Sequence, residues 1–133
     1  MRFYYLKGKN KKNYVEDTLI HLCKPYALEM TNFYDMSIDD GITSIGSPVY
    51  ILIDLSEEKL IENISKLKTI RSKYPFAYIS LLVPATEQVF KLTFKYKLKI
   101  LNCIDLASPN WKQEIEKDIL FSKDVMNNLT AKI

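Results

Sequence analysis

Val49-Tyr50-Ile51-Leu52-Ile53 is an uninterrupted apolar run near the middle of the chain, and Asp54 follows it directly. A strand with apolar side chains on both faces is typical of the centre of a parallel sheet, because helices cover both of its faces. The run therefore predicts a central strand that carries Asp54 at its carboxyl end. Ligand sites of open α/β sheets lie at the carboxyl ends of strands, so Asp54 is the first candidate site residue.

Apolar runs of strand length alternate with segments of helical period on both sides of this run, which predicts βα units and a parallel sheet. The predicted strands are residues 3–6, 27–33, 49–53, 78–83 and 100–105. The predicted helices are residues 14–22, one capped by Ser56 and running through Arg71, residues 87–97, residues 109–127, and a short one in the polar stretch around Gly41, Gly46 and Pro48. This pattern predicts an α/β, three-layer, flavodoxin-like (βα)5 fold with a five-stranded parallel sheet in the order 2-1-3-4-5.

The 133 residues, 47% hydrophobic and 26% charged, fit a single domain over residues 1–133 with one core. A formal net charge of +3 is too small to indicate a dedicated nucleic-acid binder. No apolar run approaches the roughly 20 residues of a membrane-spanning helix. Lys7 and Lys9 interrupt the N-terminal segment too early for a signal peptide. We therefore expect a soluble, cytoplasmic protein without a membrane partner.

Several kinds of chemistry have no motif in the sequence. Cys23 and Cys103 lie far apart, and the chain has one histidine, so we expect reduced core thiols and neither a zinc site nor a disulfide framework. Gly8, Gly41 and Gly46 are too widely spaced for a phosphate-binding loop. No nucleophile and base occur in a catalytic pattern. The sequence therefore predicts no metal, no cofactor and no enzymatic turnover.

Four short motifs follow the central strand in order. They are Pro75-Phe76-Ala77, Leu92-Thr93-Phe94-Lys95-Tyr96-Lys97, Ile104-Asp105 and Ile119-Leu120-Phe121-Ser122-Lys123. Together they resemble the receiver domain of LytTR-type response regulators, the accessory-gene and competence regulators of Gram-positive bacteria. The resemblance covers about the last 85 residues, from Val49 onward, whereas the first 48 share only the pattern of strands and helices.

The resemblance implies that Asp54 stands at the phosphoacceptor position. A receiver holds Mg²⁺ between this aspartate and an acidic pair after the first strand, because a hard cation prefers carboxylate oxygens. Here the matching positions read Lys7-Gly8-Lys9, whose ammonium groups would repel Mg²⁺. We expect weakened phosphorylation. One hypothesis is that Lys7 reaches Asp54 and neutralises it; the alternative is a solvated basic loop.

The remaining phosphorylation residues of the family are also missing. Receivers have a Ser or Thr at the end of the fourth strand, and the matching position in this sequence is Val83 or Pro84. Thr86 would match only if the alignment with the family were shifted further. The lysine after the fifth strand falls on Leu106. The pocket is therefore predicted to be degenerate. Asp54 is then either a residual phosphoacceptor or signal-sensing residue, or a loop aspartate that helps the next helix to begin.

Receivers of this type are thought to associate through the face formed by the fourth helix, fifth strand and fifth helix. The candidate interaction residues on that face are Phe94, Lys95, Tyr96, Lys99 and Trp111. For the aromatic residues, packing in the core is the alternative. The expected partner is a protein, either a second copy in a homodimer or a full-length response regulator, with no direct nucleic-acid contact.

The sequence thus predicts an atypical receiver, or pseudo-receiver, that serves signal transduction and transcription regulation by phosphorylation-independent association. Two alternatives stay open: phosphorylation of Asp54 by a histidine kinase, and a flavodoxin-like small-molecule-binding module at the same edge of the sheet. In the family a DNA-binding domain follows the receiver. Because this chain ends at Ile133, we expect either a free-standing receiver or an excised domain.

Overall fold

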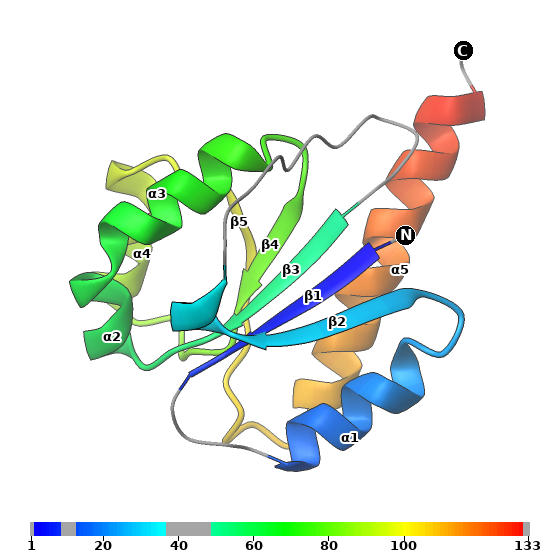
Figure 1. The fold of residues 1–133 in the computed structure, drawn as a ribbon, viewed down its shortest axis with the longest axis horizontal. Coiled ribbons are helices and arrows are strands. Elements are labelled where there is room, and N and C mark those ends of the chain that lie inside the picture. Colours follow the sequence, from blue (N-terminus) through cyan, green and yellow to red (C-terminus); the bar gives the residue numbers. More distant parts are fainter. Residues whose placement is uncertain (1, 9–12, 37–48, 132–133) are drawn as a thin grey trace.

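The computed structural model describes residues 2–8, 13–36 and 49–131. Within these residues, five strands form one parallel sheet in the order β2-β1-β3-β4-β5, and helices cover both faces (Figure 1). The strands pair only in parallel, with β3 between β1 and β4. The predicted fold class and strand order are confirmed.

The strands are β1 (Arg2–Lys7), β2 (Ala27–Asn32), β3 (Val49–Asp54), β4 (Tyr78–Leu81) and β5 (Ile100–Cys103). The helices are α1 (Asn13–Leu22), α2 (Glu57–Glu62), α3 (Ile64–Lys73), α4 (Glu87–Lys95) and α5 (Trp111–Ala131), with a short 3₁₀ helix η1 (Phe33–Asp35) after β2. The short helix predicted around Gly41, Gly46 and Pro48 lies outside the described residues.

All six residues of β3 are buried, which explains why the five residues before Asp54 are all apolar. Ile51 and Ile53 pack against α2, α3 and α4, whereas Tyr50 and Leu52 pack against α1 and α5. Successive side chains of a strand point to opposite faces, so a strand covered on both sides needs an apolar side chain at every position. The register pairs Asp54 with Lys7 on β1, so both residues reach the carboxyl edge of the sheet.

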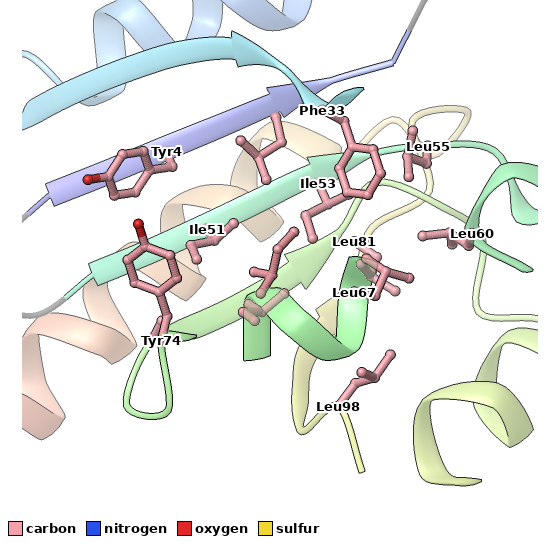
Figure 2. Close-up of a cluster of buried hydrophobic side chains, with 14 of the residues drawn as sticks. Tyr4, Phe33, Ile51, Ile53, Leu55, Leu60, Leu67, Tyr74, Leu81 and Leu98 are labelled. Atoms are coloured by element: carbon pink, nitrogen blue, oxygen red, sulfur yellow. The ribbon is translucent and has the colours of Figure 1, made fainter. Parts of the chain in front are cut away.

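The core on the side of α2, α3 and α4 is apolar along its whole length (Figure 2). The rings of Tyr4 and Tyr74 lie 6.0 Å apart at one end of this cluster. Phe33 and Leu55 close the end nearer to the carboxyl edge, as Figure 2 shows. Burial of these large side chains contributes most of the stability of such a layer. The end of β3 is therefore anchored firmly beside the candidate site.

The helix predicted from Ser56 through Arg71 is instead two helices, so that prediction is wrong. The break is at Asn63, whose φ and ψ of −112° and 25° depart from helical values. Its side-chain amide donates a 2.7 Å hydrogen bond to the carbonyl oxygen of Lys59. Asparagine side chains compete in this way with the backbone bonds of a helix. The Ser56 cap is confirmed, since its hydroxyl accepts from the N–H of Lys59 at 3.3 Å.

Several predicted ends are displaced by two to four residues. The helix predicted to reach Lys97 ends at Lys95, because Lys97 adopts a left-handed φ of 52° that no right-handed helix contains. The fourth and fifth strands end at Leu81 and Cys103, two residues before the predicted ends. The last helix runs from Trp111 to Ala131, later at both ends than predicted. Such displacements are usual where helix and strand ends fray.

The two cysteines are free thiols. Cys23 is buried among the side chains of the core on the α1 and α5 side, and this burial raises the pKa of its thiol to about 11. Cys103 is half-buried at the edge of the other cluster. The prediction of a reduced core thiol holds fully for Cys23 and partly for Cys103.

Helix α5 spans 21 residues, Trp111–Ala131, and packs one side against the sheet. Ile115 and Ile119 lie on its buried side, whereas charged residues such as Lys112 and Glu116 are exposed. This pattern is typical of an amphipathic helix at the surface of a domain. None of the helices in the described part of the chain combines the length and apolar character needed to cross a membrane.

Candidate functional site

A pocket of about 410 Å³ lies at the carboxyl edge of the sheet. Gly8, Asp54, Val83, Pro84 and Leu106 all line it. These five positions come from the ends of four strands and meet because the carboxyl ends of parallel strands share one edge. The structure thus brings together most of the residues that the sequence assigned to the degenerate phosphorylation pocket.

Asp54 is buried, with 5% of its surface exposed, and its carboxylate accepts a 2.8 Å hydrogen bond from the hydroxyl of Tyr5. Burial, followed by the negative charge of Asp54, raises the pKa of Tyr5 far above its ordinary value, so the phenol stays protonated and donates. The sequence reasoning missed Tyr5. A signal was available, since Tyr5 lies two residues before Lys7 and therefore on the same face of β1.

Lys7 forms an ion pair with a residue of the first helix. Its ammonium nitrogen lies 3.0 Å from Oε1 of Glu16 on α1, and both side chains are about a quarter exposed. This ion pair joins the end of β1 to α1. Lys9, the other lysine assigned to the pocket, lies outside the described residues.

Position 8 requires a glycine, because the backbone of β3 passes very close to it. A Cβ atom on residue 8 would lie 2.7 Å from the carbonyl oxygen of Asp54, closer than real Cβ contacts. Any side chain at this position would require the backbone of β1 or β3 to shift. The stretch that matches the acidic pair of receivers is Lys7-Gly8-Lys9. Its middle position, residue 8, has no room for an aspartate or glutamate side chain.

The ends of β4 and β5 contribute an apolar wall to the pocket. Val83 is buried and Leu106 half-buried, and neither carries a hydroxyl or an amine. Thr86, the nearest hydroxyl in the sequence, begins α4 instead. It accepts from the N–H of Val89 at 3.2 Å and donates to Oε1 of Glu57 at 2.6 Å. Its hydroxyl is therefore committed to the start of α4 and to α2.

The other charged groups of the pocket also have partners. The ammonium group of Lys59 lies 3.0 Å from Oε2 of Glu62, and Oδ1 of Asp105 accepts from the N–H of Ala107 at 2.9 Å. Within residues 2–8, 13–36 and 49–131, no three His, Cys, Asp or Glu side chains form a group that could hold a metal ion. Asp54 is the buried carboxylate of this pocket, and Val83, Pro84 and Leu106 form an apolar part of its wall beside polar residues that include Ser56 and Lys59.

A second candidate site lies on the surface between α4 and β5. Phe90 and Phe94 are 68% and 80% exposed, although both are large and apolar. They flank a hollow of about 460 Å³ whose lining is Phe90, Thr93, Phe94, Lys97, Lys99 and Ile100. We call these six residues the α4–β5 groove. Phe94 and Lys99, both predicted as interaction residues, lie in it.

The other three predicted interaction residues lie elsewhere. Lys95 is exposed on α4, next to Tyr96. Tyr96 is half-buried, with the ammonium groups of Lys68 and Lys95 lying 5.5 and 5.3 Å from its ring centre. Trp111 is 9% exposed and packs edge-on against Tyr14 in the core beside α1 and α5. Trp111 is therefore a core residue at the start of α5 and stands apart from the groove.

The fold defines the class to which the chain belongs. A parallel sheet of order 2-1-3-4-5 that alternates with helices is the receiver-like and flavodoxin-like architecture. No protein-family model matches the chain, and no curated protein matches it either. The likeness to receivers therefore rests on the fold and on the position of Asp54 at its carboxyl edge.

Proposed function

We propose that this chain is a receiver-like regulatory domain, similar to those of LytTR-type response regulators, that acts by associating with another protein. The observation that carries this proposal is the exposure of Phe90 and Phe94 beside the α4–β5 groove. Exposed apolar patches on soluble domains mark interaction sites, because leaving them in water is unfavourable. Aromatic side chains are also enriched at the centres of protein interfaces.

The residues around Asp54 support the further proposal that this association does not depend on phosphorylation. Tyr5 donates to the carboxylate that would accept the phosphoryl group. Gly8 is packed against the backbone of β3. Val83 and Leu106 supply methyl groups at positions where receivers have a hydroxyl and an ammonium group. A phosphoryl group beside Val83 and Leu106 would lose hydration there without gaining a side-chain donor from either residue.

Association is tested by sedimentation velocity of the chain, alone and mixed with a full-length LytTR-type regulator from the same organism. We expect a complex that the double variant Phe90→Ser, Phe94→Ser no longer forms. The matched control is Phe76→Ser, since Phe76 is 64% exposed on the loop after α3. The proposal would be rejected if the chain stayed monomeric and formed no complex with the regulator. It would also be rejected if the double variant still formed the complex.

The role of Asp54 is tested with beryllofluoride and Mg²⁺ on ¹⁵N-labelled protein, with Asp54→Asn as control. We expect no change in the resonances of Gly8, Asp54 and Val83 at millimolar Mg²⁺. Saturable shifts that vanish in Asp54→Asn would instead favour a receiver phosphorylated by a histidine kinase. If the purified protein showed the absorbance of bound flavin, this result would favour the small-molecule-binding alternative.

A further inference from the structure

The α4–β5 groove carries positive charge at one end and apolar side chains along the rest. Phe90, Phe94 and Ile100 form its apolar part, whereas Lys97 and Lys99 line it where the chain leaves α4 and enters β5. None of its six lining residues is acidic. An occupant that matches this surface must offer both an apolar side chain and negative charge.

The backbone at the charged end is left-handed at two positions, the first of which belongs to the cap of α4, where the N–H of Leu98 donates to the carbonyl oxygen of Thr93 at 3.0 Å. Lys97 and Lys99 both have left-handed φ angles, 52° and 53°. A residue with a Cβ atom adopts this conformation at a cost, and it persists only where the surrounding structure enforces it. Leu98, between the two lysines, is 2% exposed and is part of the core beneath α3 and α4. Burial of Leu98 thus directs the two neighbouring lysines outward.

Arg71 on α3 enforces this arrangement. Its Nε donates to the carbonyl oxygen of Leu98 at 2.8 Å, and Nη2 donates to that of Lys99 at 3.2 Å. Its Nη1 donates to the carbonyl oxygen of Ala77 at 2.8 Å, which ties the same guanidinium to the segment before β4. The lysines therefore stand on a fixed backbone. A preorganised rim lowers the entropy lost when a ligand binds.

From this geometry we infer that the α4–β5 groove binds an acidic segment of a partner protein, with a large apolar side chain between Phe90, Phe94 and Ile100 and carboxylates on Lys97 and Lys99. The inference rests on the proposed function and specifies the chemistry of the partner. The fixed backbone of the two lysines is its second support, because a preorganised rim loses less entropy when a ligand binds.

A second copy of the chain fits this groove less well. Two identical grooves related by a twofold axis would bring Lys97 and Lys99 of both copies together, and such like-charge contacts are unfavourable. Single-stranded nucleic acid also fits less well, because its phosphates need cations along the whole path. Along α4, Lys91 is already paired with Glu87 at 2.9 Å.

The test begins with selection of a random 12-residue peptide display library on the immobilised chain. We expect the selected peptides to combine Asp or Glu with at least one Phe, Leu, Ile or Trp. Titration of the selected peptides should shift the ¹⁵N resonances of Phe94, Lys97, Lys99 and Ile100. Selected sequences that are neutral or basic, or shifts that map to another surface, would overturn the inference.

The charge contribution is tested with the double variant Lys97→Asn, Lys99→Asn. Asparagine tolerates the left-handed conformation, so this variant removes two charges without added backbone strain. We expect its affinity for the selected peptides to fall on the order of tenfold at low salt, from two exposed ion pairs. The matched control is Lys24→Asn, Lys112→Asn, which removes two exposed lysines beside α1. Equal affinities of the two double variants would overturn the inference.

Two further probes separate this inference from the proposed function. Concentration-dependent dimerisation that Phe94→Ser abolishes, without selection of acidic peptides, would leave association standing and reject the acidic partner. Binding of a (dT)₁₂ oligonucleotide to the groove in preference to acidic peptides would reject the acidic partner in favour of nucleic acid. Absence of peptide selection together with a monomeric chain that binds no regulator would reject both proposals.

Discussion

Two buried carboxylates lie on the same side of the sheet, Asp54 at the end of β3 and Asp118 on α5. Both accept a hydrogen bond from a tyrosine of the sheet: Tyr5 donates to Asp54 at 2.8 Å, and Tyr50 donates to Asp118 at 3.1 Å. Their exposed fractions are similar, 5% and 7%. Burial and a tyrosine donor therefore do not distinguish a site residue from a structural one.

The surroundings of the two carboxylates differ. Asp118 also accepts from Ser80 at 3.0 Å, and Nδ2 of Asn102 lies 3.4 Å from its other oxygen. Its donors thus come from β3, β4 and β5, so one carboxylate holds α5 against three adjacent strands. Asp54 instead lines a pocket. The difference teaches that access to a cavity marks a candidate site, whereas donors from several strands mark a structural anchor.

The largest expected effect comes from Asp118→Ala. The buried hydroxyls of Tyr50 and Ser80 would lose their acceptor, and unsatisfied buried polar groups cost about 1–3 kcal/mol each. We expect the free energy of unfolding, measured by urea titration, to fall by roughly 3 kcal/mol. The dependence of this free energy on urea concentration should not change. Asp124→Ala, at an exposed position of the same helix, is the control. A loss comparable to that of the control would show that Asp118 is not an anchor.

Gly8→Ala should have the next largest effect and concerns the pocket at Asp54. The added Cβ atom would meet the carbonyl oxygen of Asp54 at 2.7 Å, so the two strands must separate locally. Overpacking of this kind costs about 1–3 kcal/mol of unfolding free energy. Lys59→Ala, which alters a half-exposed residue of the same pocket, should have a much smaller effect in the same urea titration. Equal stability of Gly8→Ala and the wild type would show that the close approach is not required.

Removal of each tyrosine hydroxyl compares the two carboxylates directly. Tyr50→Phe should lower the free energy of unfolding by about 1 kcal/mol, because Asp118 is buried between α5 and the sheet and loses a donor that water replaces poorly. Tyr5→Phe should cost less, because water in the pocket can donate to Asp54 in place of the phenol. Chemical denaturation of the two variants in parallel gives the measurement. If Tyr5→Phe lost more unfolding free energy than Tyr50→Phe, Asp54 would be the structural anchor and Asp118 would not.

The smallest expected effect is a dependence of stability on pH. Burial raises the pKa of Asp118 above 3.8, more than its hydrogen-bond donors lower it, so the folded state binds a proton more readily than the unfolded chain. Stability from this group is therefore present at low pH and is lost as pH rises from about 3.8 through the raised pKa.

Urea titrations of the wild type and Asp118→Asn between pH 3 and pH 7 measure this contribution. The advantage of the wild type over Asp118→Asn should be greatest at the acidic end and should shrink as pH increases. An advantage that grows with pH would mean that the hydrogen bonds from Tyr50, Ser80 and Asn102 outweigh burial, so that Asp118 is held ionised.

Much of the pocket followed from the sequence, because it depends on strand order and strand ends alone. Once Val49–Asp54 is taken as the central strand, the residues after the neighbouring strands must meet at the same edge. The resemblance to receivers assigned Gly8, Val83 and Leu106 to this edge, and an error of two residues at the end of the fourth strand did not displace them.

The partners of the charged groups did not follow from the sequence. Lys7 pairs with Glu16 because α1 packs over the end of β1, and long side chains reach whichever helix lies nearest. Asn63 interrupts a helix through a side-chain bond that helical periodicity does not contain. Asp118 appears in the sequence as one of many charged helix residues, and only packing buries it.

The sequence by itself determined the sheet, its strand order and the position of Asp54, because hydrophobic periodicity and chain connectivity are properties of the local sequence. Tertiary structure alone decided that Tyr5 donates to Asp54, that Arg71 fixes the backbone of Lys97 and Lys99, and that Trp111 is buried while Phe94 is exposed. Hydrogen bonds and burial depend on distances between segments far apart in the chain, and these distances exist only after the layers have packed.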